Sequence, residues 1–127
     1  MSNLLALRAG TELAGEYRIE RVLGAGGFGI TYLAEERSLD RLVTIKEYFP
    51  ADFAVRDGSV DAVPRSLGCA GDYKWGLDRF IAEAQTLARF EHPNIVRVYR
   101  YFRSNNTGYI VLRYEDGQSL TDWLKGL

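Results

Sequence analysis

Apolar and polar residues alternate along much of the chain, in the pattern of strands that bury one face. This alternation, together with a high content of β-branched and aromatic residues, predicts five strands. They cover residues 17–24, 29–36, 41–47, 94–101 and 108–114. Residues 1–16 are expected to form a lead-in that partly packs on the first strand.

A second period in the pattern predicts one long helix over residues 73–90. Apolar residues recur there at spacings of three and four, which is typical of a helix with one buried face. That face consists of Leu77, Phe80, Ile81, Ala84, Leu87 and Ala88. Asp72 is the expected N-cap, and Pro93 ends the helix. A capping-box pattern at 119–122 predicts the start of a last helix over 123–127.

The segment between the third strand and the helix, residues 48–72, is interrupted by residues that break regular structure. These are Pro50, Gly58, Pro64, Gly68 and Gly71. They rule out one long helix. Asp57-Gly58 lies between two short β-prone runs, at 53–56 and 59–63, and this predicts an inserted hairpin with a two-residue turn. The pattern indicates no function for this insertion.

The composition limits the class of protein. A chain of 127 residues suffices for one hydrophobic core, and 16 basic against 17 acidic side chains give a net charge of −1. That balance provides no electrostatic basis for binding nucleic acid or an anionic membrane. Cys69 is the only cysteine, so an internal disulfide and a cysteine zinc site are excluded, and no metal site is expected. The single cysteine fits a reducing, cytoplasmic setting, and no apolar run reaches the length of a membrane span.

A glycine-rich turn lies between the first two predicted strands. Gly24, Gly26 and Gly29 fit the pattern G-x-G-x-x-G, in which absent side chains let backbone N–H groups approach a phosphate. A dinucleotide-binding fold would place a helix directly after Gly29, with an acid such as Glu47 further on. The β-forming run 30–34 favours a strand instead. The dinucleotide fold is therefore a distant alternative.

A second fold places a V-A-I-K strand after a glycine hairpin, and Val43-Thr44-Ile45-Lys46 matches that strand. With G-G-F-G-I-T-Y and I-K-E-Y-F-P as well, the sequence resembles the N-terminal lobe of bacterial eukaryotic-like (Hanks-type) serine/threonine protein kinases. The resemblance implies an α+β fold, a five-stranded antiparallel twisted sheet with one long helix, helix C. Residues 17–114 would be this lobe, with an insertion at about 48–72. Residues 115–127 would be the hinge and the start of the first helix of a C-terminal lobe.

The resemblance also implies an ATP site. The loop residues that would hold the phosphates are Gly24, Ala25, Gly26, Gly27, Phe28 and Gly29, with Phe28 as the lid. Lys46 would bind the phosphates as a fixed cation, and Glu83 on the helix would orient Lys46. The periodicity places Glu83 at the edge of the buried face, where a carboxylate needs a partner.

The adenine base would bind at the hinge. By resemblance, Leu112 is the gatekeeper residue, and the Arg113 carbonyl and the Glu115 N–H contact the adenine edge. The walls of the pocket would be Leu23, Thr31 and Thr44. The family pattern has valine and alanine where this chain has the two threonines. Ser119 matches a ribose-contacting position and fits a helix N-cap equally well.

The chain contains neither H-R-D-x-x-x-x-N nor D-F-G, the motifs that supply the catalytic base and the magnesium ligands in this family. We therefore expect these residues to be inactive alone, and Mg²⁺ to require a C-terminal lobe. Two functions remain: the ATP-binding half of a kinase that phosphorylates a protein substrate, or a non-catalytic lobe that binds nucleotide or a partner protein. Without a second lobe, an apolar underside would be exposed and would favour self-association. It comprises Leu23, Leu87, Val98 and Leu112.

Overall fold

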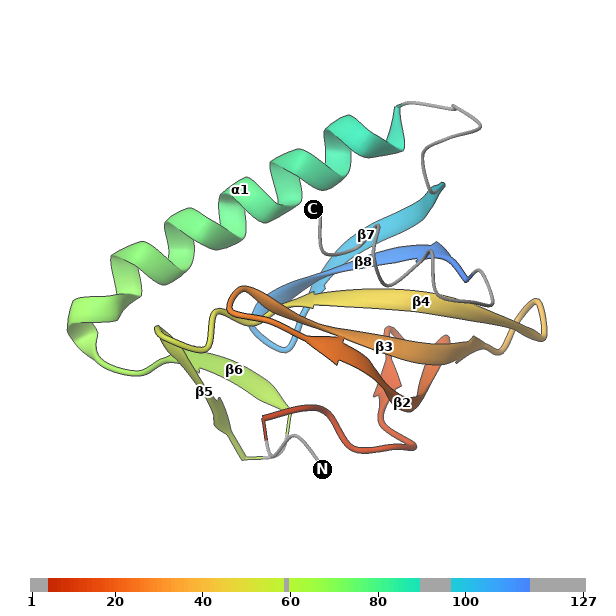
Figure 1. Cartoon of the computed structure of the whole chain (residues 1–127), viewed down its shortest axis with the longest axis horizontal. Helices are drawn as coiled ribbons and strands as arrows, with labels where there is room; N and C mark the ends of the chain where they lie inside the picture. The colour runs from red at the N-terminus through yellow and green to blue at the C-terminus, as the bar shows by residue number, and fades with distance from the viewer. Residues whose placement is uncertain (1–4, 59, 90–96, 115–127) are drawn as a thin grey trace.

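The computed structural model describes residues 5–58, 60–89 and 97–114, which form a curved antiparallel sheet, one long helix and a separate small hairpin (Figure 1). The strands of the sheet are β1 (Glu12–Leu13), β2 (Tyr17–Ala25), β3 (Gly29–Glu36), β4 (Arg41–Tyr48), β7 (Val98–Ser104) and β8 (Thr107–Arg113). Their order is β1-β2-β3-β4-β8-β7. All five expected strands are present, although β7 begins at Val98 and ends at Ser104 instead of covering 94–101, and residues 94–96 lie outside the described part of the chain. The lead-in contributes β1, which pairs with β2 and makes the sheet six-stranded.

The helix α1 (Ala70–Ala88) lies across one face of the sheet, against β7 and β8 (Figure 1). It begins earlier than predicted, directly after the short 3-10 helix η1 (Leu67–Cys69). The N-cap residue is therefore Cys69, and the prediction of Asp72 is wrong. Asp72 instead lies in the first turn, where its charge interacts favourably with the helix dipole.

The predicted buried face of the helix is largely confirmed. Leu77, Ile81 and Ala84 are buried, whereas Phe80 and Leu87 are half-buried. Ala88, the last residue of α1, is exposed. The helix therefore contacts the sheet most closely along its middle.

The insertion forms the expected hairpin, in which β5 (Ala54–Asp57) pairs with β6 (Asp61–Pro64). Its loop is longer than the predicted two residues, because Asp57 pairs with Asp61. Gly58 has a φ of 68°, a left-handed conformation that glycine adopts without a steric penalty.

The turn between β7 and β8 is tighter than the predicted polar segment. β7 continues to Ser104 and β8 begins at Thr107, so Asn105 and Asn106 form a two-residue turn. Both have positive φ, 54° and 61°, which asparagine tolerates better than most residues. This turn binds the insertion: the Ala62 N–H donates to the Asn105 carbonyl at 2.9 Å, and the Asn106 amide donates to the Ala62 carbonyl at 2.8 Å.

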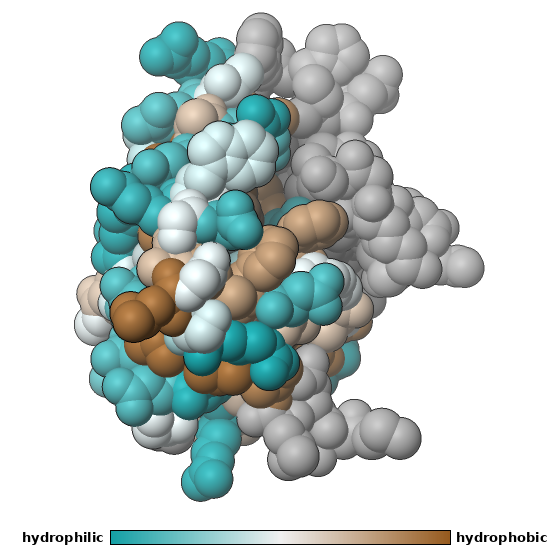
Figure 2. All heavy atoms as spheres, turned by 90° about the vertical axis from the view of Figure 1, so that its left-hand side faces the viewer, coloured by the Kyte–Doolittle hydropathy of each residue, from teal (hydrophilic) through white to brown (hydrophobic). Residues whose placement is uncertain are grey.

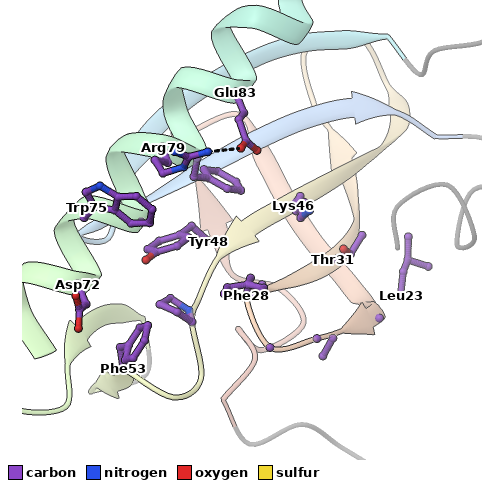
Figure 3. Close-up of a pocket in the computed structure, with 18 residues that line it drawn as sticks. Leu23, Phe28, Thr31, Lys46, Tyr48, Phe53, Asp72, Trp75, Arg79 and Glu83 are labelled. Atoms are coloured by element: carbon purple, nitrogen blue, oxygen red, sulfur yellow. Dashed lines mark ion pairs between the residues drawn. The ribbon is translucent and has the colours of Figure 1, made fainter. Parts of the chain in front are cut away.

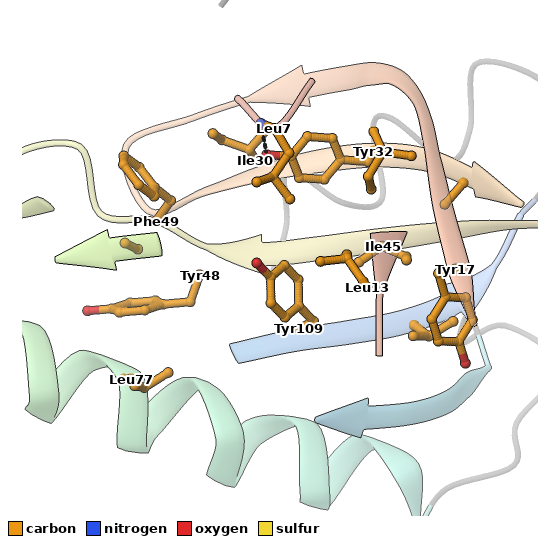
Figure 4. Packing of buried hydrophobic residues seen from close by; sticks show 14 of the residues in the cluster. Leu7, Leu13, Tyr17, Ile30, Tyr32, Ile45, Tyr48, Phe49, Leu77 and Tyr109 are labelled. Atoms are coloured by element: carbon orange, nitrogen blue, oxygen red, sulfur yellow. Dashed lines mark hydrogen bonds between the residues drawn. The ribbon is translucent and has the colours of Figure 1, made fainter. Parts of the chain in front are cut away.

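The central strands present two faces. Residues that pair across strands share a face, as Thr31 and Lys46 do on the helix side and Tyr32 and Ile45 do on the other. The second face, opposite the helix, is covered by the lead-in and the insertion (Figure 4). The covering residues are Leu7, Leu13, Phe49, Ala54 and Ala62. The insertion therefore contributes to the hydrophobic core.

Two residues of the expected exposed underside are buried. Val98 and Leu112 are 7% and 1% exposed and pack beneath α1, so the expectation of exposure is wrong for them. Leu23 and Leu87 are half-buried. Self-association through this surface stays a prediction. Within the described ranges, no helix combines the length and apolar character that a membrane crossing requires.

Candidate functional site

The glycine-rich turn and α1 border a cavity of about 810 Å³ (Figure 3). Its lining comes from the turn, from β3 and β4, from the start of the insertion and from α1. The lining residues are Leu23, Gly24, Ala25, Gly26, Gly27, Phe28, Gly29, Thr31, Lys46, Tyr48, Pro50, Phe53, Asp72, Trp75, Gly76, Arg79, Phe80 and Glu83. The structure thus brings the predicted phosphate-loop residues together with Thr31, Lys46 and Glu83.

The glycine-rich turn joins two strands directly. Residues 30–34 belong to β3, so no helix follows Gly29 and the dinucleotide alternative is wrong. The Gly26 N–H donates to the Gly29 carbonyl at 2.9 Å and closes the turn. A Cβ on Gly29 would lie 2.5 Å from the Glu47 carbonyl oxygen, so β3 and β4 approach too closely here for any side chain.

The turn has backbone donors available for an anion. The carbonyls of Gly27 and Phe28 accept hydrogen bonds from the N–H groups of Ala51 and Phe49, at 3.1 and 3.0 Å. The N–H groups of Gly27 and Phe28 donate to no acceptor in the described part of the chain. Free N–H groups in a glycine turn are typical phosphate ligands. The Phe28 side chain, 76% exposed, lies beside them at the edge of the cavity.

Lys46 supplies a cation to the same cavity. It pairs with Thr31 of β3 and with Ile110 of β8, so its position is fixed by two neighbouring strands. Burial lowers the pKa of the Lys46 ammonium, and the charge of Glu83 opposes part of that shift. A bound polyanion would stabilise the charged form much as Glu83 does, and more strongly because it carries more charge.

Glu83 lines the cavity but does not form an ion pair with Lys46 (Figure 3). Its carboxylate pairs with Arg79, one turn earlier on α1, at 3.9 Å. The Glu83 side chain is 63% exposed, so the expectation of a carboxylate held at the buried face is wrong. Arg79 lies within reach of this carboxylate one helical turn away, and its guanidinium also lies 5.0 Å from the Trp75 ring centre.

The residues expected around adenine are divided by the structure. Leu23 and Thr31 line the cavity, whereas Thr44, Leu112 and Arg113 do not. Thr44 and Leu112 face each other on β4 and β8 and are almost fully buried. The Thr44 hydroxyl has no hydrogen-bond partner among the described residues, and Arg113 is exposed at the end of β8. Glu115 and Ser119 lie outside the described residues.

Several lining residues were not foreseen as site residues in the sequence. Tyr48, Pro50 and Phe53 follow Lys46 directly into the insertion, and Trp75 and Arg79 come from the polar side of α1. The run I-K-E-Y-F-P was the available signal for the first group, because it continues the strand that bears Lys46. Exposed apolar surface is visible among charged side chains at this end of the molecule, with Trp75 63% exposed (Figure 2).

No cluster of three or more His, Cys, Asp or Glu side chains suited to a metal ion occurs within residues 5–58, 60–89 and 97–114. The cations that line the described site are the Lys46 ammonium and the Arg79 guanidinium, which pairs with Glu83. Their chemistry suits a phosphate ligand.

Comparison with known proteins identifies the family to which the fold belongs. The protein kinase domain family matches residues 17–126. Serine/threonine-protein kinase PrkC of Bacillus subtilis is 34% identical over 115 residues, which is 91% of this chain. Serine/threonine-protein kinase PknJ of Mycobacterium tuberculosis is 34% identical over 119 residues, 94% of this chain. The chain spans only 15% and 17% of the lengths of these two relatives.

Solved structures also match this chain over most of its length. PpkA-294 in its apo form matches with a TM-score of 0.87 at 34% identity, over 95% of this chain and 43% of that one. The kinase domain of Mycobacterium tuberculosis PknI matches with a TM-score of 0.61 at 26% identity, over 88% of this chain and 38% of that one. The sheet and helix described above therefore correspond to less than half of each solved chain.

Proposed function

This chain belongs to the protein kinase domain family, as a fragment with the fold of the N-terminal lobe, and we propose that it is the ATP-binding half of a serine/threonine protein kinase. One observation carries the proposal. The N–H groups of Gly27 and Phe28, which have no acceptor within the described part of the chain, line the same cavity as Lys46. Phosphoryl transfer requires a polyanion to be positioned and its charge neutralised, and these groups provide both.

Each part of the site has a distinct role in this proposal. The turn at 24–29 donates backbone hydrogen bonds to the phosphates, and Phe28 covers them from water. Lys46 neutralises phosphate charge, and it gains a favourable partner for an ammonium group that burial otherwise disfavours. Glu83 orients Lys46 once its carboxylate turns away from Arg79.

The base and ribose would bind further along the sheet. Leu23 and Thr31 would pack on the adenine, with Thr44 and the gatekeeper Leu112 behind them. The Arg113 carbonyl and the Glu115 N–H would bind its edge. Ser119 would contact the ribose. The buried Thr44 hydroxyl lies next to Leu112 in the sheet and has no partner within the described ranges, and a ligand beside it would supply a polar neighbour.

Transfer to a protein serine or threonine would need groups that these residues do not contain. The sequence holds neither H-R-D-x-x-x-x-N nor D-F-G, so the catalytic base and the ligands for Mg²⁺ would come from a C-terminal lobe. When bound there, Mg²⁺ would offset the charge of the phosphates. We therefore propose that this chain binds ATP but does not phosphorylate a protein by itself.

A non-catalytic lobe that binds nucleotide or a partner protein is the second candidate. The observation in its favour is the Arg79–Glu83 ion pair, which leaves Lys46 without the carboxylate that phosphoryl transfer uses.

Titration with ATP tests the proposal. Ligand that binds only the folded state stabilises it by about 2.7 kcal/mol at a hundred times its dissociation constant, so millimolar ATP should raise Tm. Lys46→Met should lose most of that shift, whereas Lys74→Met, on an exposed part of α1, should keep it. Absence of a shift for the unaltered protein would contradict ATP binding. A longer parent chain whose Tm rises with ATP but which transfers no phosphate to protein would favour the second candidate.

A further inference from the structure

A buried polar cluster lies directly behind the proposed phosphate site. Glu47 follows Lys46 on β4, so the two side chains point to opposite faces of the sheet. Glu47 is fully buried, and both carboxylate oxygens are bound. Tyr32 donates to Oε1 at 2.7 Å and Tyr109 to Oε2 at 2.8 Å. The Arg56 guanidinium donates to the same two oxygens, at 2.5 and 3.0 Å.

Arg56 joins this carboxylate to the insertion and to the lead-in. It lies on β5 of the insertion, and its side chain is 7% exposed. Its Nε donates to the Leu5 carbonyl at 2.6 Å, and Nη1 donates to the Val60 carbonyl at 2.9 Å. The guanidinium also lies 4.3 Å from the centre of the Phe49 ring. One planar cation therefore fixes β4, the insertion and the lead-in relative to one another.

The segment held by Arg56 in turn holds the glycine-rich turn. Phe49, beneath the guanidinium, donates its N–H to the Phe28 carbonyl, and Ala51 donates to the Gly27 carbonyl. Because a peptide group is planar and trans, a carbonyl directed at Ala51 turns the N–H of Phe28 to the opposite side. The hydrogen bond from Ala51 therefore sets the direction of a proposed phosphate donor, the Phe28 N–H, and the bond from Phe49 holds the next peptide group of the turn.

We propose that Arg56 is a positioning residue for phosphate binding, acting through Glu47 and Phe49 on the glycine-rich turn and on the strand end that bears Lys46. This inference rests on the proposed function. Without the guanidinium, the Glu47 carboxylate would be a buried charge with no cation, and it would move toward water or take up a proton. Either change releases Phe49 and Ala51 from the position in which they hold the turn. The insertion thus serves the nucleotide site from behind the sheet.

Amide hydrogen exchange without nucleotide tests the mechanical part of this inference. In Arg56→Met, we expect the amides of Phe49 and Ala51 to exchange about ten times faster, while that of Ile81 in α1 changes less than about twofold. Arg41→Met is the control. Arg41 begins β4, at the opposite end of that strand from Glu47, and it binds another buried carboxylate, Glu36 of β3, at 2.5 Å. This variant should leave Phe49 and Ala51 unchanged.

Unchanged exchange at Phe49 and Ala51 in Arg56→Met would overturn the inference. Equal acceleration in Arg41→Met, or equal acceleration along α1, would overturn it as well, since both indicate general loss of stability. If Arg56→Met fails to fold, Arg56→Lys replaces it. Lysine keeps the charge but lacks the planar guanidinium, so we expect an intermediate acceleration of exchange at the same two amides. Unchanged exchange at both amides in Arg56→Lys would contradict the proposal.

Calorimetric titration separates this inference from the proposed function. In Arg56→Met, the affinity for ATP should fall about tenfold, and the affinity for adenosine, which has no phosphates, should change less than about twofold. If the unaltered protein binds ATP and the variant binds it equally well, only the positioning role fails. If the unaltered protein binds no ATP, the proposed function fails, and the exchange experiment still decides whether Arg56 holds the turn.

Discussion

Glu83 and Arg79 form an ion pair of 3.9 Å on the wall of the cavity that contains Lys46, so the carboxylate proposed to orient the lysine is bound within its own helix. Both side chains are more than half exposed. Exposed pairs one helical turn apart contribute little to stability, so a competing partner can replace Arg79. A phosphate that draws the Lys46 ammonium into the cavity would offer Glu83 such a partner.

Glu83→Gln should therefore separate stability from binding. Without ATP, we expect the free energy of unfolding to change by less than about 0.5 kcal/mol, because the exposed pair with Arg79 contributes no more. The affinity for ATP should fall. Urea unfolding and calorimetry measure the two quantities. A loss of several kcal/mol without ATP would mean that Glu83 already pairs with Lys46 in solution. Arg79→Gln is the control, and it should leave the affinity for ATP unchanged or higher.

Lys46→Met should stabilise the protein while abolishing its response to ATP. Burial lowers the pKa of Lys46 below its usual 10.5, so above the lowered value the unfolded chain binds more protons than the folded one. Stability therefore rises with pH through that window in the unaltered protein, and the methionine variant should lose this dependence. Tm measured between neutral pH and pH 10 tests both points. A lower Tm for the variant at neutral pH would show that the ammonium has a stabilising partner.

Gly76→Ala should destabilise the helix against the sheet. A Cβ at Gly76 would overlap the Tyr48 hydroxyl, which donates to the Tyr73 carbonyl at 3.0 Å. We expect a loss of about 1–3 kcal/mol, typical of overpacking. Gly71→Ala is the control, because nothing lies within 4 Å of its Cβ, and there alanine should add up to about 1 kcal/mol through helix propensity. Equal effects in urea unfolding would contradict the close contact.

The prediction for Gly76 has a second-site test. Tyr48→Phe removes the oxygen that the new Cβ meets, so the double variant should lose less stability than the sum of the two single variants. Additive losses would place the cause elsewhere.

Two buried threonines should respond oppositely to replacement by valine. The Thr44 hydroxyl is buried and has no hydrogen-bond partner in residues 5–58, 60–89 and 97–114, so Thr44→Val should raise the free energy of unfolding by about 1 kcal/mol. Thr107 donates to the Tyr48 carbonyl at 2.5 Å, and Thr107→Val should lower it by about 1–3 kcal/mol, since that carbonyl loses its donor. Thermal and urea unfolding measure both. Destabilisation by Thr44→Val would mean that its hydroxyl has a partner in solution.

Alkaline pH should unfold the protein cooperatively with tyrosine ionisation. Burial raises the pKa of Tyr48 to about 12, and it also raises the pKa of Tyr32 and of Tyr109, where the Glu47 charge adds to the effect. Unfolded tyrosines ionise near 10.0, so the folded state binds more protons above that value and its stability is lost between pH 10 and 12. Tyrosinate absorbance and circular dichroism should change together. Full ionisation with an intact fold would contradict the burial.

The glycine-rich turn and its relation to Lys46 could be predicted from the sequence because both depend on local pattern. The alternation predicted the two strands and the motifs named Thr31 and Lys46 as site residues, while the pairing of these two residues across β3 and β4 came from the structure. The partner of Glu83 could not be predicted in the same way. Helical periodicity left Glu83 at the border of the buried face, and the nearby Arg79 decided its contact.

Glu47 shows a different limit. In the sequence it is one acid in an alternating strand, and its complete burial depends on Arg56, from a hairpin whose position relative to the sheet has no local signal. Asp72 illustrates a smaller error of the same kind. A short 3-10 turn before α1 carried the helix start back past Gly71, which sequence propensity treats as a breaker.

The covered rear face of the sheet has a consequence for how this lobe can be shortened. Cutting out the hairpin between Phe49 and Ser66 would expose the Glu47 carboxylate and the Tyr32 and Tyr109 hydroxyls together, and it would remove the cation that balances them. Water would then enter the buried region on the face of the sheet opposite Lys46, and the Glu47 carboxylate would carry an unbalanced negative charge there. A truncated lobe would therefore need a redesigned rear surface, in which nonpolar residues replace all three polar groups at once.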